Sequence, residues 1–328
     1  MNARSLILIA VAAQMLIAPA FAQSAKPAPK TPPAKAQKEQ PAKSDANLDL
    51  AFGAYQRGYY LTAFNEATKR VDEQKDPKAM TLLAELYANG FGVKQDDAKA
   101  AEWYKLAADR GDREAMFSLA MFRIGGRGGP KSREEAAKLL ASAAKLGHVA
   151  AAYDLALLYI EGTQFPQDFG RAAELLRQAA DGGSPEAQYA LATFYKDGRG
   201  VQKDDREAAK LMGAAALAGN LEAQTEYSIA LYNGTGVTKD EAAAAQLLLK
   251  AARRGSPIAQ NRLARVLASG RGLPADPVEA VKWHMISKAG GVTDLYLDEF
   301  AQKQPPSVRE AAEKAAKPWL TMLTASRS

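Results

Sequence analysis

Apolar residues in the segment 76–291 fall into two helical stripes that recur every 36 residues. The first unit shows both stripes, one made of Ala79, Leu83, Ala84 and Tyr87, the other of Ala100, Trp103, Ala107 and Ala108. Apolar residues at intervals of three to five positions lie on one face of an α-helix. We therefore expect a helix over residues 76–88, a tight turn and a second helix over residues 96–109, with the same hairpin in each later unit.

Glycine holds this register through six units without a gap. The three glycine series are Gly111, Gly147, Gly183, Gly219, Gly255 and Gly291; Gly90, Gly126, Gly162, Gly198, Gly234 and Gly270; and Gly92, Gly128, Gly200, Gly236 and Gly272, with Gln164 in the missing place. Glycine is favoured just past a helix end, where the backbone turns left-handed. A register kept this long predicts a repeat protein, in which each hairpin buries its apolar face only against its neighbours.

Each predicted helix begins at a residue suited to bind the free amides of the first turn. For the first helix of each unit these are Asp76, Asp112, His148, Ser184, Asn220 and Ser256, and for the second Asp96, Ser132, Asp168, Asp204, Asp240 and Asp276. All except histidine are common N-caps. Glu135, Glu207 and Glu279 lie three residues after a cap, so we expect them to complete capping boxes.

The motif Leu83-Ala84-x-x-Tyr87-x-x-Gly90-x-Gly92-Val93, continued by Asp96, Ala100, Trp103 and Gly111, resembles the Sel1-like repeat, a relative of the tetratricopeptide repeat. The resemblance covers residues 76–291, about two-thirds of the chain. It implies an all-α fold, a right-handed α-solenoid of stacked helix-turn-helix repeats. The third unit departs most, because Thr163-Gln164-Phe165-Pro166 replaces the turn and Gly170 weakens its second helix.

Both flanks of the repeats are expected to be helical. Residues 48–75 resemble a degenerate first hairpin of the tetratricopeptide type. Residues 292–328 predict two capping helices separated by Pro305-Pro306. Atypical end units of this kind shield the terminal faces of a solenoid from water.

The N-terminal residues predict export. Arg4 precedes a short apolar run, and Ala20-Phe21-Ala22 is a signal-peptidase pattern with cleavage after Ala22, so residues 1–22 are assigned as a signal peptide. An uncleaved anchor is the alternative. Residues 23–47, rich in Pro, Ala and Lys, predict an extended, disordered linker. In a bacterium we therefore expect the protein to be periplasmic or secreted. Without cysteine the chain has no site for lipoprotein acylation.

Charge adds little to this picture. The net charge of the whole chain is +6. Arg4 and a net +3 in the linker account for most of it, which leaves about +2 on the folded part. No basic nucleic-acid surface is therefore expected. Five linker lysines could make a weak contact with the envelope, although a solvated spacer is the plainer interpretation: Lys26, Lys30, Lys35, Lys38 and Lys43.

No group of residues predicts catalysis, a cofactor or a metal. The two histidines, His148 and His284, are far apart in sequence and each occupies a repeat position. The aspartates that begin the second helices are caps one repeat apart, and not a converging acid–base pair. The glycine-rich stretch 125–132 has Pro130 where a phosphate loop needs glycine, and no strand precedes it.

The candidate site is the concave wall, whose positions are implied by the resemblance. They lie on the first helix of each unit, two before, two after and five after the motif leucine. Units two and three carry apolar or aromatic residues there, and unit four carries Tyr189, Thr193 and Lys196, so the middle of the wall is mainly apolar and aromatic. The candidate partner-binding residues are Phe117, Met121, Ile124, Tyr153, Leu157, Ile160, Tyr189 and Thr193. Units one and six carry polar residues there, including Glu85 and Arg265. The alternative is that these side chains only pack between neighbouring helices.

Three functions remain open from the sequence. The first is an exported adaptor or regulator that binds a partner protein or peptide on the concave face, and the resemblance implies a role in envelope signalling or surface assembly. The second is a module that binds a cell-wall component such as peptidoglycan. The third is a hydrolase, and the absence of a nucleophile–base pair and of cysteine counts against it.

Overall fold

The computed structural model describes residues 50–325, so the predicted signal peptide and linker lie outside the described residues. Within this range the chain forms helices and no strand. In chain order the helices are α1 (Leu50–Gln56), α2 (Tyr60–Gln74), α3 (Pro77–Asn89), α4 (Asp97–Ala108), α5 (Arg113–Gly125), α6 (Arg133–Lys145), α7 (Val149–Glu161), α8 (Phe169–Asp181), α9 (Pro185–Asp197), α10 (Asp205–Leu217), α11 (Leu221–Asn233), α12 (Glu241–Arg253), α13 (Pro257–Ser269), α14 (Pro277–Ala289), α15 (Leu295–Lys303) and α16 (Pro306–Ala325).

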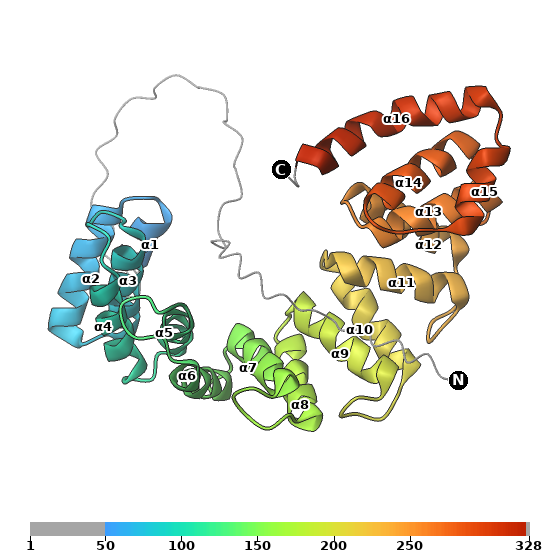
Figure 1. The fold of residues 1–328 in the computed structure, drawn as a ribbon. Coiled ribbons are helices and arrows are strands. Elements are labelled where there is room, and N and C mark those ends of the chain that lie inside the picture. The colour runs from blue at the N-terminus through green and yellow to red at the C-terminus, as the bar shows by residue number, and fades with distance from the viewer. Residues whose placement is uncertain (1–49, 326–328) are drawn as a thin grey trace, which may run out of the picture. The chain divides into compact units, whose positions relative to one another are not determined.

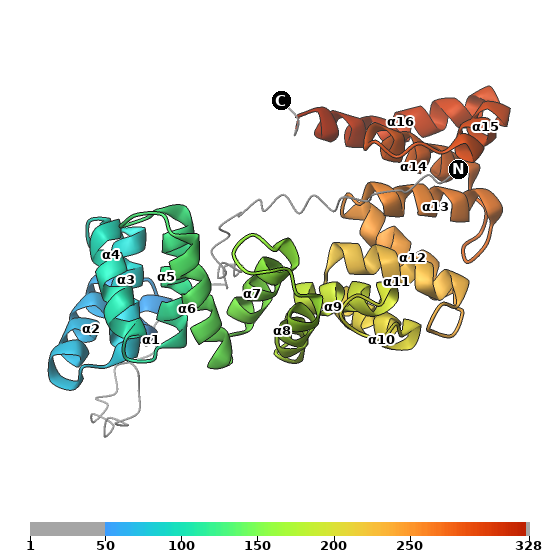
Figure 2. The ribbon, with the colours of Figure 1, turned by 60° about the horizontal axis from the view of Figure 1, so that its bottom comes forward.

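The helices stack as hairpins in chain order. Each helix from α1 to α14 packs against the next one along the chain, and α16 packs on α14 (Figures 1 and 2). Alanine supplies much of the buried surface; Ala100, Ala136 and Ala172, at one position of successive repeats, are almost fully buried. Small side chains at these contacts let neighbouring helices approach closely. The predicted all-α solenoid of helix-turn-helix repeats is confirmed.

The predicted helix starts are confirmed at all twelve capping positions. From α3 to α14, the side chain of each expected cap accepts a hydrogen bond from a backbone N–H of the first turn. Even His148 does so, because its Nδ1 accepts from the Ala151 amide at 3.1 Å. The caps satisfy amides that the helix itself leaves free.

The expected capping boxes are wrong. In a capping box the glutamate would accept from the amide of the cap residue. That amide already donates to a carbonyl of the preceding helix, as Ser132 N does to Arg123 O at 2.9 Å. A backbone N–H is a single donor, so Glu135 pairs with Arg123 Nε at 2.8 Å instead. Glu207 and Glu279 pair with lysines of their own helices.

One glycine series fixes the distance between repeats. Gly236 has φ +68, and a Cβ there would lie 1.8 Å from the carbonyl oxygen of Asp205, which begins the second helix of the preceding repeat. Gly128, Gly200 and Gly272 lie equally close to the corresponding helix starts. The turn of one hairpin therefore rests directly on the backbone of the hairpin before it, at a separation that only glycine permits.

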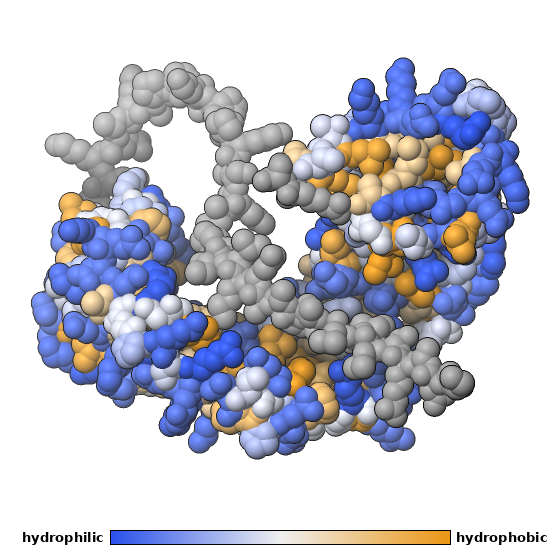
Figure 3. All heavy atoms as spheres, in the orientation of Figure 1, coloured by the Kyte–Doolittle hydropathy of each residue, from blue (hydrophilic) through white to orange (hydrophobic). Residues whose placement is uncertain are grey.

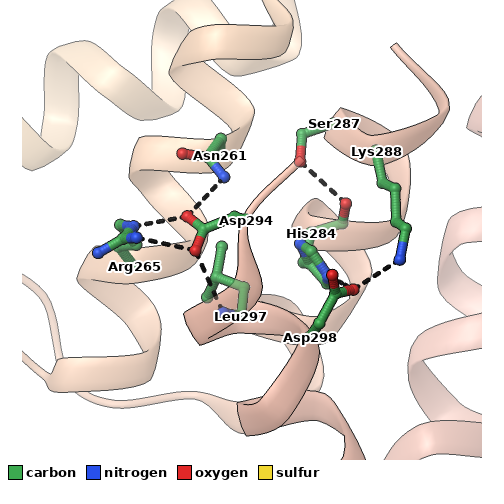
Figure 4. Close-up of polar contacts among 8 residues, drawn as sticks. All are labelled: Asn261, Arg265, His284, Ser287, Lys288, Asp294, Leu297 and Asp298. Carbon is green, nitrogen blue, oxygen red and sulfur yellow. Dashed lines mark hydrogen bonds and ion pairs between the residues drawn. The ribbon is translucent and has the colours of Figure 1, made fainter. Parts of the chain in front are cut away.

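The C-terminal helices are attached through a buried carboxylate. Asp294, whose side chain is only 4% exposed, caps α15 and binds Arg265 of α13 through Nε at 2.6 Å and Nη2 at 2.8 Å (Figure 4). Asn261 Nδ2 donates to the same carboxylate at 2.9 Å. Burial alone would raise the pKa of Asp294, but these hydrogen bonds outweigh it and lower the pKa. Trp319 of α16 packs edge-on against Trp283 of α14.

Two glycine substitutions separate close packing from backbone strain. Gly219, with φ +99, has open space where a Cβ would be placed. We expect Gly219→Ala to destabilise the protein by about 1 kcal/mol, from the left-handed backbone alone. Gly236→Ala should cost about 3 kcal/mol or more, since the clash displaces a neighbouring repeat as well. Urea unfolding followed by circular dichroism measures both. Equal losses of stability in the two variants would show that the short distance to the Asp205 carbonyl adds nothing to the destabilisation at position 236.

Candidate protein-binding surface

One position on the first helix recurs in every repeat; we call it the first column, and its members are Thr81, Phe117, Tyr153, Tyr189, Thr225 and Asn261. In four of the repeats its side chain contacts the cap of the next helix pair. At the two ends of the solenoid its members are polar and bind that cap. Thr81 Oγ1 donates to Asp112 Oδ1 at 3.0 Å, and the hydroxyls of Thr225 and Ser256 lie 3.1 Å apart. Asn261 binds the cap Asp294 as described above. In these repeats the first column therefore fastens one hairpin to the next.

In the middle repeats the first column is aromatic. The Phe117 ring stacks on the imidazole of the cap His148, with ring centroids 4.5 Å apart. His148 is itself fixed, by the Ala151 amide on one side and by Glu114 Oε2 at 3.2 Å on the other. Phe117 is half-buried and packs on the core, so part of its role is structural.

Tyr153 and Tyr189 contribute to the fold through their rings but not through their hydroxyl groups. Both rings are half-buried against core residues. Burial raises the pKa of both hydroxyls, with nearby carboxylates such as Asp154 and Glu226 adding to the effect. Neither hydroxyl forms a hydrogen bond with any residue in the range 50–325. An aromatic ring with a free polar end at a surface is the type of group that most often anchors a protein partner.

The other five candidate residues also lie at the boundary between core and surface. Met121, Ile124, Leu157, Ile160 and Thr193 are all half-buried. The Thr193 hydroxyl donates to its own helix, at Ala190 O. Met121, Ile124 and Ile160 pack against the core, and all five side chains keep an accessible side, so their burial does not decide between the two interpretations of the wall.

A cavity of about 540 Å³ joins two of the candidates. Phe117 and Tyr153 line it, together with His148, Ser184 and Glu186. Hydrophobic residues also reach the surface between α7 and α9, with hydrophilic residues around them (Figure 3). The first-column rings Phe117 and Tyr153, which belong to neighbouring repeats, thus line the same surface cavity.

Asp154, next to Tyr153 on α7, adds an unusual charge to this region. Its carboxyl is half-buried and accepts no hydrogen bond from the described residues. Burial raises its pKa from 3.8 to about 6, against a smaller lowering effect of His148. Near neutral pH the carboxylate is thus ionised in a poorly solvated place, where a cationic group of a partner would be favourable.

A second cavity, of about 620 Å³, lies at the N-terminal end between α1, α2, α3 and α5. Glu85 lines it with Asp112 and Glu114. Burial and the charge of Glu114 raise the pKa of Glu85 from 4.5 to about 7, although the Tyr55 hydroxyl donates to it. Sequence analysis assigned Glu85 to the polar end of the wall, but the burial of its carboxyl depends on α1 and could not be deduced from the repeat.

The described part of the chain shows no metal-binding cluster and no membrane-spanning helix. Residues 50–325 contain no group of three or more His, Asp or Glu side chains placed to hold a metal ion. His284 lies on α14, where Nε2 is 2.9 Å from Asp298 Oδ1, and Lys288 donates to the same oxygen at 2.6 Å (Figure 4). In the same range, no helix has both the length and the apolar character that a membrane crossing requires.

Comparison with known proteins agrees with the repeat fold described above. Six consecutive segments match the family model of the Sel1 repeat, namely residues 77–112, 113–148, 149–184, 185–220, 221–256 and 257–284. A Sel1 repeat protein from Oxalobacter formigenes is 28% identical, with a TM-score of 0.62 over 76% of this chain and 100% of that one. A protective antigen of uropathogenic Escherichia coli strains, which displays an SLR fold, is 25% identical, with a TM-score of 0.57 over 83% and 67%. Curated proteins give no match.

The raised pKa of Glu85 predicts a pH-dependent loss of stability. The folded protein holds the Glu85 proton up to about pH 7, whereas the unfolded chain releases it near 4.5, so stability falls as the pH rises between these values. Glu85→Gln removes this loss. Relative to the wild type, the variant should gain about 3 kcal/mol between pH 4.5 and pH 8. Thermal unfolding at both pH values measures the change.

Glu134→Gln is the matched control. Glu134 is exposed, and the ion pair with Lys138 lowers its pKa, so it stabilises the fold above pH 4.5. The control should therefore change in the opposite direction and lose stability relative to the wild type as the pH rises. A Glu85→Gln variant whose stability difference is the same at both pH values would contradict the assignment.

Proposed function

The chain belongs to the Sel1 repeat family, and from this premise we propose that it is a non-catalytic scaffold that binds a segment of a partner protein across α5, α7 and α9. Repeats of this family generally mediate contacts between proteins. The proposed surface comprises the eight candidate residues of the wall, from Phe117 to Thr193.

The change of residue type along the first column carries the proposal. Where Thr81, Thr225 and Asn261 bind the next cap, the polar side chain is used by the fold. Tyr153 and Tyr189 replace it with rings whose hydroxyls bind nothing in the described chain. A large half-buried ring leaves apolar surface exposed to water, which is unfavourable. A bound partner would remove that surface from water.

The arrangement suits an extended or helical segment. Phe117, Tyr153 and Tyr189 recur once per repeat, so they supply anchors at regular intervals along the stacked helices. Polar and charged side chains border these rings. Glu186 is one of these side chains, and Lys196 is another, with its Nζ 2.8 Å from Glu226 Oε2. Apolar anchors inside a polar rim are typical of surfaces that bind proteins.

The proposed place of action is outside the cytoplasm. Residues 1–22 support export, since Arg4, the apolar run and Ala20-Phe21-Ala22 form a signal-peptide pattern. An exported scaffold with a protein-binding wall would act as an adaptor or regulator of the cell envelope, in signalling or in surface assembly.

Removing the two free tyrosines tests the proposal. The double variant Tyr153→Ala and Tyr189→Ala should lower photo-crosslinking to the partner at least tenfold, because two anchor rings are lost. Helical content should change little, since neither hydroxyl supports the fold. The measurement is crosslinking in the native compartment, with a photoreactive residue placed at Thr193 and the crosslinked protein quantified by mass spectrometry.

Tyr59→Ala is the matched control, because Tyr59 is an exposed ring on another helix start, far from the wall in the sequence. It should leave the crosslinking yield unchanged. If the double variant keeps the yield of the wild type while circular dichroism shows an intact fold, the wall is not the binding surface.

A further inference from the structure

A smaller cavity, of about 320 Å³, lies between α11 and α13 and contains three arginines and no acidic residue among its lining. Ile229 and Tyr232 of α11 form one side. They occupy the same repeat positions as the wall residues Leu157 and Ile160, so the cavity continues the wall toward the C-terminus. The arginines are Arg262, Arg265 and Arg271, and Tyr296 of α15 completes the rim.

Arg265 is held in place by the fold. Asp294 binds its Nε and Nη2, and the guanidinium carbon lies 5.1 Å from the centre of the Tyr296 ring (Figure 4). A two-point ion pair of this kind fixes the plane of the guanidinium. Three of its five N–H groups remain available, because only two take part in the pair.

Arg271 is oriented in a similar way. Its Nη2 donates to Glu241 Oε1 at 2.5 Å, and its guanidinium carbon lies 5.1 Å from the centre of the Tyr232 ring. Glu241 begins α12 and does not line the cavity. Two guanidinium groups therefore stand over two aromatic rings, each held by a carboxylate outside the cavity.

Arg262 differs because it has no partner. It is exposed on α13, one turn before Arg265 and Val266 on the same helix face, and forms no hydrogen bond or ion pair with any residue in the range 50–325. Asp294 pairs with Arg265, and Glu241 is shared between Arg271 and Lys239, whose Nζ is 2.8 Å away and which does not line the cavity. The cavity thus presents donors from three guanidinium groups, of which only that of Arg262 has no carboxylate partner among the described residues.

We propose that this cavity binds a single carboxylate, the side chain of an aspartate or glutamate in the partner segment that the wall holds. The inference rests on the function proposed above and adds the chemistry of one partner residue. Arg262 would supply the opposite charge, and Arg265 would supply oriented N–H donors. Tyr232, Ile229 and Val266 would contact the aliphatic part of the same side chain or of its neighbour.

The net charge decides between a carboxylate and a polyanion. A phosphate dianion, a nucleic acid or a polyanionic glycan would need several uncompensated cations along a track. Among the three lining arginines only Arg262 lacks a carboxylate partner in the described chain, and it balances one negative charge. The small volume, with apolar groups on one side and guanidinium groups on the other, fits an acidic residue beside an aliphatic or aromatic one.

Peptide selection tests this assignment. The full-length chain is used to select binders from a phage-displayed library of random 12-residue peptides, in parallel with Arg262→Glu and with the Tyr153→Ala, Tyr189→Ala double variant. Peptides enriched on the wild type should carry Asp or Glu next to an apolar residue. By fluorescence anisotropy, the synthetic peptides should bind Arg262→Glu at least tenfold more weakly, and replacing their acidic residue by Gln should weaken binding to the wild type similarly.

Arg253→Glu is the matched control, since Arg253 is an exposed arginine of α12 that also lacks a partner among the described residues but does not line the cavity. It should change the affinity less than twofold. Enriched peptides without acidic residues, or with equal affinity for Arg262→Glu and the wild type, overturn the carboxylate site while the proposed function stands. Peptides that bind the double tyrosine variant as well as the wild type overturn the proposed function, and a selection with no enrichment overturns both.

Discussion

The close contact between the turn of one hairpin and the backbone of the preceding one sets the geometry on which the other surfaces depend. At Gly236 a single added carbon would lie 1.8 Å from the Asp205 carbonyl oxygen, so the spacing of these repeats is fixed by hard contact. The alanines buried between hairpins, such as Ala100 and Ala136, are the side chains that this spacing can accommodate. The larger side chains of the first helices divide between the core, where Leu119 and Leu191 are buried, and the wall, where Phe117 and Tyr189 are half-buried.

The N-cap of each first helix then acquires two roles. Its side chain satisfies the amides of its own helix and also meets the first-column residue of the repeat before it, as Asp112 does with Thr81. A polar residue in that column strengthens the junction between two hairpins. An aromatic residue gives up this hydrogen bond and gains apolar contact with the core. Tyr153 and Tyr189 therefore mark junctions that lack this hydrogen bond and keep an aromatic ring half-exposed instead.

The sequence predicts the features that depend on a residue and its own helix. Caps and turn glycines are of this kind, and even the unusual cap His148 follows from its place in the register. Features that depend on the neighbouring repeat are predicted poorly. The capping box at Glu135 fails because a carbonyl of the previous helix takes the amide it needs. Arg265, expected at the polar end of the wall, lies there but is also fixed by the buried Asp294, a residue outside the repeat register, which Asn261 binds as well. The cavity at Glu85 likewise requires α1, which no repeat position encodes.

The two end cavities differ in how far their charges are already balanced, and this difference bears on how a partner would be aligned. At the N-terminal cavity the carboxylates Glu85, Asp112 and Glu114 face Arg70, Lys78 and Arg113, so acids and bases are equal in number. At the C-terminal cavity Arg262 is left without a counter-ion. Aromatic anchors repeated every 36 residues fix neither the direction nor the register of a bound segment, because each looks like the next. A single uncompensated charge at one end breaks that equivalence, and a polar contact of this kind contributes more to specificity than to affinity.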